Sequence, residues 1–148
     1  MSEYSPEVVS VGYEGLSQTD LVARLVDAGV SILVDVRQTP ISRKRGLSKT
    51  ALGEALAAEG IHYLHLRELG NPRENREAYR QGDAQSRRRF RAILKTPPAQ
   101  NALHRMSELV CEGTLGVLCF EHDHETCHRH QVIEELRAIQ PDLQVTLA

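Results

Sequence analysis

The sequence has few cysteines, no long apolar run and no basic, apolar segment at its start. Its three cysteines include no CxxC pair, so a structural zinc site of the ribbon type lacks its ligand pairs. No apolar run approaches the roughly eighteen residues that a membrane span needs, which predicts a soluble protein without a membrane partner. Because the start, MSEYSPEVVSVG, does not resemble a signal peptide, we expect a cytoplasmic protein with reduced cysteines and no disulfide.

The sequence also lacks internal repeats and low-complexity segments. Hydrophobic residues make up 41% and charged residues 26% of the chain, a balance typical of globular rather than disordered proteins. With a length of 148 residues, the chain suits one ordinary domain. We therefore expect a single domain over residues 1–148.

Charge is unevenly distributed, although the net charge is only −2. Between Arg37 and Lys95 lie fourteen of the eighteen basic residues and only six of the twenty acidic ones. A basic surface that faces a phosphate-bearing partner would explain this, and so would an arginine-rich helix whose charges simply face water. Only Tyr79 and Phe90 stand among the arginines of residues 73–95, fewer aromatic residues than a surface that stacks single-stranded bases would want.

Short apolar runs alternate with amphipathic segments along the chain. The runs that predict strands are residues 8–12, 31–36, 61–66, 114–121 and 143–148. Helices are predicted over residues 21–29, 49–60, 86–95, 99–113 and 127–140, with Pro97 and Pro98 separating two of them. Residues 68–83 are polar and contain Pro72 and Gly82, which predicts a loop with at most one irregular helical turn.

This alternation predicts an α/β three-layer sandwich, with a mostly parallel open sheet of about five strands and helices on both faces. Ligands of such sheets bind beyond the carboxyl ends of the strands. The chemically unusual segments do follow strands, in the order GYEG, residues 37–45, RELGNPR and HDHETCHR. We therefore expect the loops after the first, second and fourth strands to share one site.

The segment Cys119–Gln131 holds two cysteines, four histidines and one arginine. Thr126 is predicted to cap a helix that begins at Cys127, whose first N–H groups and dipole would favour an anion and lower the pKa of the Cys127 thiol. His128 could carry a proton, and Arg129 could clamp a phosphate with two hydrogen bonds. Packing is the alternative role of Cys127, and Cys119 is expected in the core of its strand.

Two further hypotheses concern the same segment. A cysteine phosphatase or sulfurtransferase loop needs an arginine five or six residues after a cysteine at a strand end, but His124 and Glu125 follow Cys119 at these distances. A metal site is the other hypothesis, because cysteine, histidine and Glu121 are suitable soft and borderline ligands. Their spacing matches no established zinc motif, so anion binding ranks above metal binding.

The loops after the first two strands supply further candidates. Asp35 interrupts an apolar strand and needs a partner if it is buried. Arg37 either pairs with Asp35 and orders the loop or reaches the ligand, and Arg43 and Lys44 add positive charge. Gly12 and Tyr13 contribute flexible backbone and a hydroxyl group.

Four ordered motifs, spread over about residues 11–135, resemble the domain of unknown function 488 family. They are GYEG at 12–15, DVR at 35–37 followed by P-x-SRK at 40–44, GI-x-Y-x-H-L-x-ELG at 60–70, and C-x-E-x5-CHR at 119–129. The family often has phenylalanine where this chain has Leu47, which preserves an apolar contact. Its last motif contains His128 alone of the four histidines, so His122, His124 and His130 inherit no role. The resemblance implies an α/β sandwich with a shared site but no particular reaction.

The sequence thus favours a protein that binds a phosphate-bearing small molecule or nucleic acid at the carboxyl ends of the sheet, with hydrolase or transferase chemistry that depends on cysteine and histidine. The alternatives are a metal-dependent enzyme that uses Cys119, Cys127 and histidines, and a non-enzymatic nucleic-acid-binding module. No metal ligand, cofactor or oligomeric state is assigned. The candidate catalytic residues are Asp35, Glu121, Cys127 and His128, and the candidate ligand-binding residues are Gly12, Tyr13, Arg37, Arg43, Lys44 and Arg129.

Overall fold

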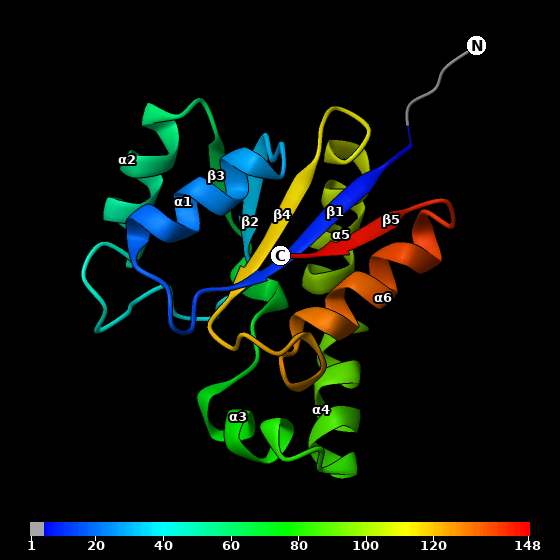
Figure 1. Cartoon of the computed structure of the whole chain (residues 1–148). Helices are drawn as coiled ribbons and strands as arrows, with labels where there is room; N and C mark the ends of the chain where they lie inside the picture. Colours follow the sequence, from blue (N-terminus) through cyan, green and yellow to red (C-terminus); the bar gives the residue numbers. More distant parts are fainter. Residues whose placement is uncertain (1–4) are drawn as a thin grey trace.

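A computed structural model describes residues 5–148 and contains one five-stranded sheet. All strand pairs are parallel, in the order β3-β2-β4-β1-β5 (Figure 1). The strands are β1 Glu7–Gly12, β2 Ile32–Asp35, β3 His62–His65, β4 Leu115–Cys119 and β5 Gln144–Leu147. The predicted α/β class and strand number are confirmed.

Helices cover both faces of the sheet, which completes the predicted three-layer sandwich (Figure 1). The helices are α1 Gln18–Asp27, α2 Lys49–Ala58, α3 Arg73–Arg80, α4 Ala84–Leu94, α5 Pro97–Leu109 and α6 Arg129–Ile139, with short 3-10 turns at η1 Arg67–Leu69 and η2 His124–Thr126. Helices α1 and α2 lie on one side, α5 and α6 on the other, and α3 and α4 lie below the lower ends of the strands in Figure 1. None of the helices in residues 5–148 is long and apolar enough to cross a membrane.

Two hydrophobic cores lie on opposite faces of the sheet. Because side chains alternate along a strand, Val8 of β1 belongs to the core under α5 and α6, while its neighbour Val9 belongs to the core under α1 and α2. The central strand β4 is buried along its whole length. Each fully buried leucine in these cores contributes roughly 1.5–3 kcal/mol of transfer free energy.

Residues 68–83 differ from the sequence prediction, because they contain the eight-residue helix α3. Asn75 and Tyr79, one turn apart, are both buried, and the Asn75 side chain exchanges hydrogen bonds with Ser86 of α4. Tertiary packing therefore stabilises a segment whose polar composition favours a loop. The predicted break between two helices is present, but it lies at residues 95–96, and Pro97 and Pro98 form the first turn of α5, where proline fits.

The strand order places a crevice beside β4. The connections after β1 and β2 run through α1 and α2, whereas the connection after β4 runs through α6 on the opposite face. Loops that leave neighbouring parallel strands toward opposite faces open a crevice at the carboxyl ends of the strands. The topology thus places the loops after β1, β2 and β4 around one site.

Candidate functional site

A cavity of about 570 Å³ lies at the carboxyl ends of β1, β2 and β4. Five of the residues selected from the sequence line it, namely Tyr13, Arg37, Arg43, Glu121 and His128. The other five, Gly12, Asp35, Lys44, Cys127 and Arg129, lie outside its lining. The three loops therefore converge as expected. Of the ten selected residues, however, only five form the cavity wall, and the other five do not line it.

Asp35 and Arg37 form a buried ion pair at the end of β2. Arg37 Nη2 lies 2.7 Å from Asp35 Oδ2, and Arg37 Nε donates to both carboxylate oxygens. Arg37 Nη1 also donates to the carbonyl of Leu47 at 2.8 Å and to the Tyr13 hydroxyl at 3.3 Å. Burial alone would lower the pKa of Arg37, but the hydrogen bonds and charge of Asp35 raise it above its ordinary value. Of the two roles considered for Arg37, its contacts fulfil the one that orders the loop.

The same carboxylate organises β3. The Tyr63 hydroxyl donates a hydrogen bond to Asp35 Oδ2, and His65 Nε2 donates to the carbonyl of Arg37 at 2.7 Å. Burial and the negative charge of Asp35 raise the pKa of Tyr63. Asp35 is fully buried, so these contacts make it the support of the cavity wall rather than a part of its surface.

The neighbours Arg43 and Lys44 have different positions. Arg43 is exposed and lines the cavity. Lys44 Nζ instead donates to the carbonyls of Tyr13 and Leu16, at 3.3 and 3.1 Å. Lys44 therefore ties the loop after β2 to the loop after β1.

Gly12 permits the loops after β1 and β4 to touch. A Cβ atom at this position would lie 1.8 Å from the carbonyl oxygen of Glu121, far inside van der Waals contact. The next residue, Tyr13, donates its backbone N–H to the carbonyl of Cys119 at 3.2 Å. The glycine of the GYEG motif thus serves a close backbone approach that brings Tyr13 to the cavity.

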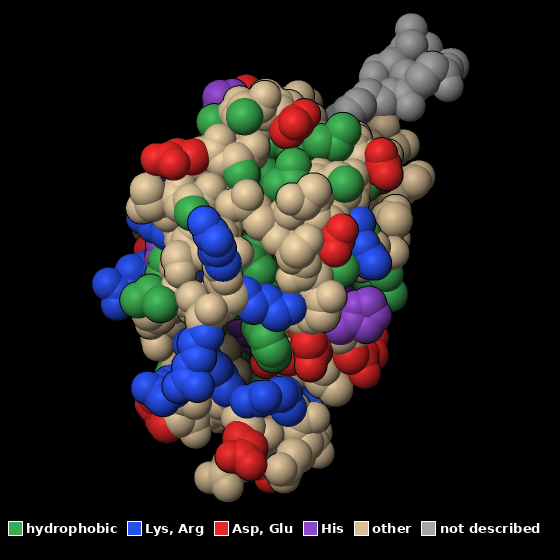
Figure 2. Space-filling view, turned by 60° about the vertical axis from the view of Figure 1, so that its left-hand side comes forward, with side chains coloured by type: hydrophobic (Ala, Val, Ile, Leu, Met, Phe, Trp, Pro, Cys, Tyr) green, Lys and Arg blue, Asp and Glu red, His purple; other side chains and the backbone are tan. Residues whose placement is uncertain are grey.

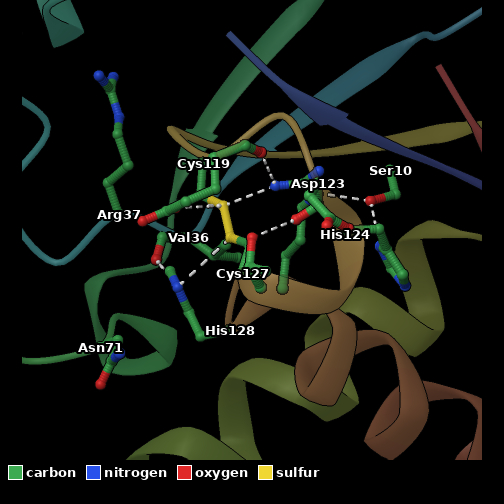
Figure 3. The surroundings of a disulfide bond; sticks show 12 residues. Ser10, Val36, Arg37, Asn71, Cys119, Asp123, His124, Cys127 and His128 are labelled. Atoms are coloured by element: carbon green, nitrogen blue, oxygen red, sulfur yellow. Dashed lines mark hydrogen bonds between the residues drawn. A yellow bond between two sulfur atoms is a disulfide. The ribbon is translucent and has the colours of Figure 1, made fainter. Parts of the chain in front are cut away.

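Cys119 and Cys127 are joined by a disulfide (Figure 3), which contradicts the expectation of cysteines without a disulfide. The turn η2 folds the segment between them, residues 120–126, back on itself, through the hydrogen bond from the Thr126 N–H to the Asp123 carbonyl. Both cysteines are buried, but only Cys119 lines the cavity. The sulfur nearest to a bound ligand therefore belongs to the residue that the sequence placed in the core.

His128 lies between this sulfur pair and the loop after β2 (Figure 3). Its Nε2 donates to the carbonyl of Val36 at 2.8 Å, which leaves Nδ1 as the acceptor, 3.7 Å from Cys127 Sγ. Burial lowers the pKa of His128 to about 4, with smaller effects of the same sign from the charges of Arg76 and Arg129. The imidazole is therefore neutral at pH 7, with its Nδ1 lone pair directed at the sulfurs.

Arg129 is buried behind the loop after β4 and does not line the cavity. It donates to Cys119 Sγ at 3.0 Å, to Ser10 Oγ at 2.6 Å and to the carbonyls of Glu121 and His122 at 2.5 and 3.1 Å. Burial lowers its pKa to about 10, although the charges of Glu121 and Asp123 act in the opposite direction. Its contacts hold the loop in place and support the Cys119 sulfur.

The predicted start of the last helix was wrong. Thr126 belongs to η2, where its hydroxyl donates to the carbonyl of Asp123. Helix α6 begins at Arg129, with His128 at the N-cap position and no capping hydrogen bond from that side chain. The segment folds as a turn before the helix because the side chain of Asp123, rather than that of Thr126, accepts a hydrogen bond from a backbone N–H group, that of Glu125.

The structure adds α3 to the site, which the sequence analysis did not include. Arg76, Tyr79 and Arg80 line the cavity from this helix. Arg76 Nε donates to the carbonyl of Asn71 at 3.1 Å, and Arg80 Nε lies 3.7 Å from Glu121 Oε1. The spacing of Arg73, Arg76 and Arg80 at i, i+3 and i+7 was the available signal, since it puts three cations on one helical face.

A comparison with curated proteins finds no match. The pattern of the family described as "Domain of unknown function DUF488" matches residues 17–136, most of the chain and nearly all of the site. Gly12 and Tyr13 lie just before the matched range, and the loops after β2 and β4 lie within it. The chain therefore belongs to the family of the domain of unknown function DUF488.

Proposed function

We propose that this protein binds a phosphate-bearing small molecule of the nucleotide type in the cavity at the carboxyl ends of the sheet. The observation that carries the proposal is the charge of the cavity wall. Four arginines line the cavity, Arg37, Arg43, Arg76 and Arg80. Asp35 neutralises Arg37, so the charge available to a ligand comes from Arg43, Arg76 and Arg80, against the single carboxylate of Glu121. Such a wall raises the local concentration of anions.

The arginines come from two separate elements of the fold. Arg43 stands on the loop after β2, whereas Arg76 and Arg80 stand on α3. The hydrogen bond from Arg76 to the carbonyl of Asn71 holds that side chain at the wall. A planar guanidinium can bind two phosphate oxygens at once, so each of these side chains could hold a phosphate with paired hydrogen bonds.

The same cavity has an apolar side that suits a ring. Ile41 and Phe120, 72% and 38% exposed, are two of the exposed large hydrophobic residues and both line the cavity. Phe120 packs edge to face against Tyr13, with 5.4 Å between ring centroids. The volume of about 570 Å³ falls within the usual range for small-molecule sites. These features favour a ligand that combines a phosphate with a flat apolar group.

Cys119, Glu121 and His128 border the same cavity and provide its chemistry. In the reduced protein they are a thiol, a carboxylate and a neutral imidazole, which suits a hydrolase or transferase that depends on cysteine and histidine. We propose that the chain acts as a single domain in the cytoplasm.

Equilibrium dialysis with nucleoside monophosphates and with the corresponding nucleosides tests the proposal. We expect saturable binding of the monophosphates and much weaker binding of the nucleosides. Arg43→Ala and Arg76→Ala should each weaken binding about tenfold or more, because each removes a charge-assisted contact worth about 1.5–3 kcal/mol. Arg105→Ala, an exposed residue of α5 outside the cavity lining, is the matched control and should bind as the unaltered protein does.

Nucleic acid is the competing ligand, because Lys and Arg side chains gather over the lower half of the face in Figure 2, next to a hollow in the surface. Two of the arginines of α4 are however engaged within the protein. Arg87 donates to the carbonyls of Tyr79 and Glu125, and Arg89 pairs with Glu74. Binding of oligonucleotides much tighter than that of mononucleotides, with a steep loss of affinity as salt increases, would favour nucleic acid and count against the small molecule.

A further inference from the structure

Three potential metal ligands converge at the floor of the cavity. Cys119 Sγ, Cys127 Sγ and a ring nitrogen of His128 all lie within 4.8 Å of one another, and all three residues are buried (Figure 3). Two sulfurs and one imidazole are a soft and borderline donor set, which zinc and similar ions prefer. The three donors come from the end of β4 and from the turn that precedes α6.

The orientation of His128 suits coordination through Nδ1. Because Nε2–H donates to the carbonyl of Val36, the Nδ1 lone pair is directed toward the sulfurs. A tetrahedral zinc ion with Zn–S of about 2.3 Å and Zn–N of about 2.0 Å would separate these donors by roughly 3.5 Å. The 3.7 Å between Cys127 Sγ and His128 Nδ1 is close to that separation.

The residues around the donors resemble the second shell of a metal site. Histidines that bind metals usually donate their other N–H to a carbonyl or carboxylate, as His128 does to Val36. Arg129 donates to Cys119 Sγ at 3.0 Å, and this contact would stabilise a thiolate there. The Cα atoms of the two cysteines are 7.4 Å apart, wider than the spacing of about 4.4–6.8 Å in ordinary disulfides and wide enough for an ion between the sulfurs.

We propose that Cys119, Cys127 and His128 hold one zinc-like divalent ion when the two cysteines are reduced. Binding breaks the two S–H bonds, forms two metal–sulfur bonds and one metal–nitrogen bond, and releases two protons to solvent. No electrons are transferred. A dithiol reductant supplies the two electrons and two protons that convert the disulfide into the two thiols before the ion binds. The disulfide and the metal complex are thus alternative states of the same sulfur pair, and only the dithiol form binds the ion.

Three protein ligands leave a fourth position for water or substrate, as in catalytic rather than structural zinc sites. Cys119 and His128 both line the cavity, so this position faces the space in which we propose that the phosphate-bearing ligand binds. Glu121 Oε2 lies 3.7 Å from Cys119 Sγ, which places a carboxylate where it could accept a proton from a water molecule on the ion. This extension to hydrolysis rests on the proposed function, whereas the metal site does not.

Zinc titration of the reduced full-length protein, in competition with a chromophoric chelator, tests the site without any nucleotide. We expect one equivalent of zinc to bind, and the disulfide form of the same protein to bind none at this site. Cys119→Ser and Cys127→Ser should no longer bind zinc stoichiometrically. Cys111→Ser is the control, since Cys111 is an exposed free cysteine, and it should bind one equivalent. Reduced protein that binds no zinc, or a Cys119→Ser variant that binds it unchanged, would overturn the proposal.

Alkylation of the unaltered protein gives a result that does not depend on the folding of any variant. Zinc should protect Cys119 and Cys127 from alkylation and leave Cys111 reactive. Equal rates for Cys119 and Cys127 with and without zinc would contradict the metal site.

Cobalt substitution tests the open position separately. The cobalt form should show thiolate-to-cobalt charge transfer and the visible bands of a four-coordinate ion, and azide should change these bands in a saturable way. Absence of any change with azide would contradict the open position. Failure of nucleoside monophosphates to bind, with zinc binding intact, would reject the proposed function alone.

Discussion

The carboxylate of Asp35 and the guanidinium of Arg37 lie 2.7 Å apart at the carboxyl end of β2 and are almost completely buried. The pair supports the cavity wall through further hydrogen bonds to Tyr13, Leu47 and Tyr63. Removal of one partner leaves the other charge buried and uncompensated, which costs far more than the loss of a surface pair.

Asp35→Asn should therefore lower the free energy of unfolding by about 3–5 kcal/mol, as measured by urea denaturation. Glu74→Gln is the matched control, because Glu74 pairs with Arg89 at the surface, and its unfolding midpoint should change little. Similar small effects of both substitutions would show that Arg37 finds another partner.

Gly12→Ala should disrupt the contact between the loops after β1 and β4. The added Cβ would lie 1.8 Å from the carbonyl oxygen of Glu121, so the backbone must shift. We expect a loss of at least about 3 kcal/mol of stability in thermal or urea unfolding, comparable to severe overpacking. Gly53→Ala, within helix α2, is the control, since the added Cβ would make ordinary contacts of 3.8 Å with Tyr63 of β3. It should be neutral or stabilising by up to about 1 kcal/mol.

Arg129→Lys should destabilise the protein although it keeps the charge. Lysine cannot reproduce the guanidinium contacts with Ser10, Cys119 and two carbonyl groups. The loss of two charge-assisted hydrogen bonds predicts a decrease of about 3 kcal/mol or more in the free energy of unfolding. Arg105→Lys, at an exposed position, should leave it unchanged. An Arg129→Lys variant of normal stability would show that these contacts do not stabilise the folded protein.

Stability should fall in alkaline solution because of Tyr79. Burial raises the pKa of Tyr79 to about 12, whereas an unfolded chain loses this proton near pH 10. The contribution of Tyr79 to the free energy of unfolding is complete below pH 10 and is lost as the pH rises toward 12, because the unfolded state then binds fewer protons than the folded state. Its size is about 3 kcal/mol, from two pKa units at 1.36 kcal/mol each.

Urea unfolding between pH 9 and pH 12 measures this effect. In Tyr79→Phe the free energy of unfolding should fall less steeply with pH. Some slope should remain, because the pKa of Tyr63 is also raised. An unchanged slope in Tyr79→Phe would show that the hydroxyl of Tyr79 ionises normally in the folded protein.

The sheet and most helices could be predicted because their signals are local. Apolar runs such as residues 31–36 and the leucine spacing of α1 follow the periods of a strand and a helix, and Ser17 caps α1 through the Asp20 N–H. The strand-end rule then indicated which loops surround the site. Helix α3 escaped prediction because its stability depends on hydrogen bonds between Asn75 and Ser86, which lie on different helices.

The sequence by itself determined the layered α/β fold, the loops that meet beyond the strand ends and the family of the chain. Only the tertiary structure decided what each residue in those loops does. Arg37 and Arg129 have the same side chain, yet one lines the cavity beside its carboxylate partner and the other is buried against Ser10 and Cys119. Likewise Cys119 becomes a neighbour of Cys127 and His128 only when the turn η2 folds back over the end of β4. Side-chain direction and long-range contacts depend on the packing of distant segments, which residue type and spacing do not specify.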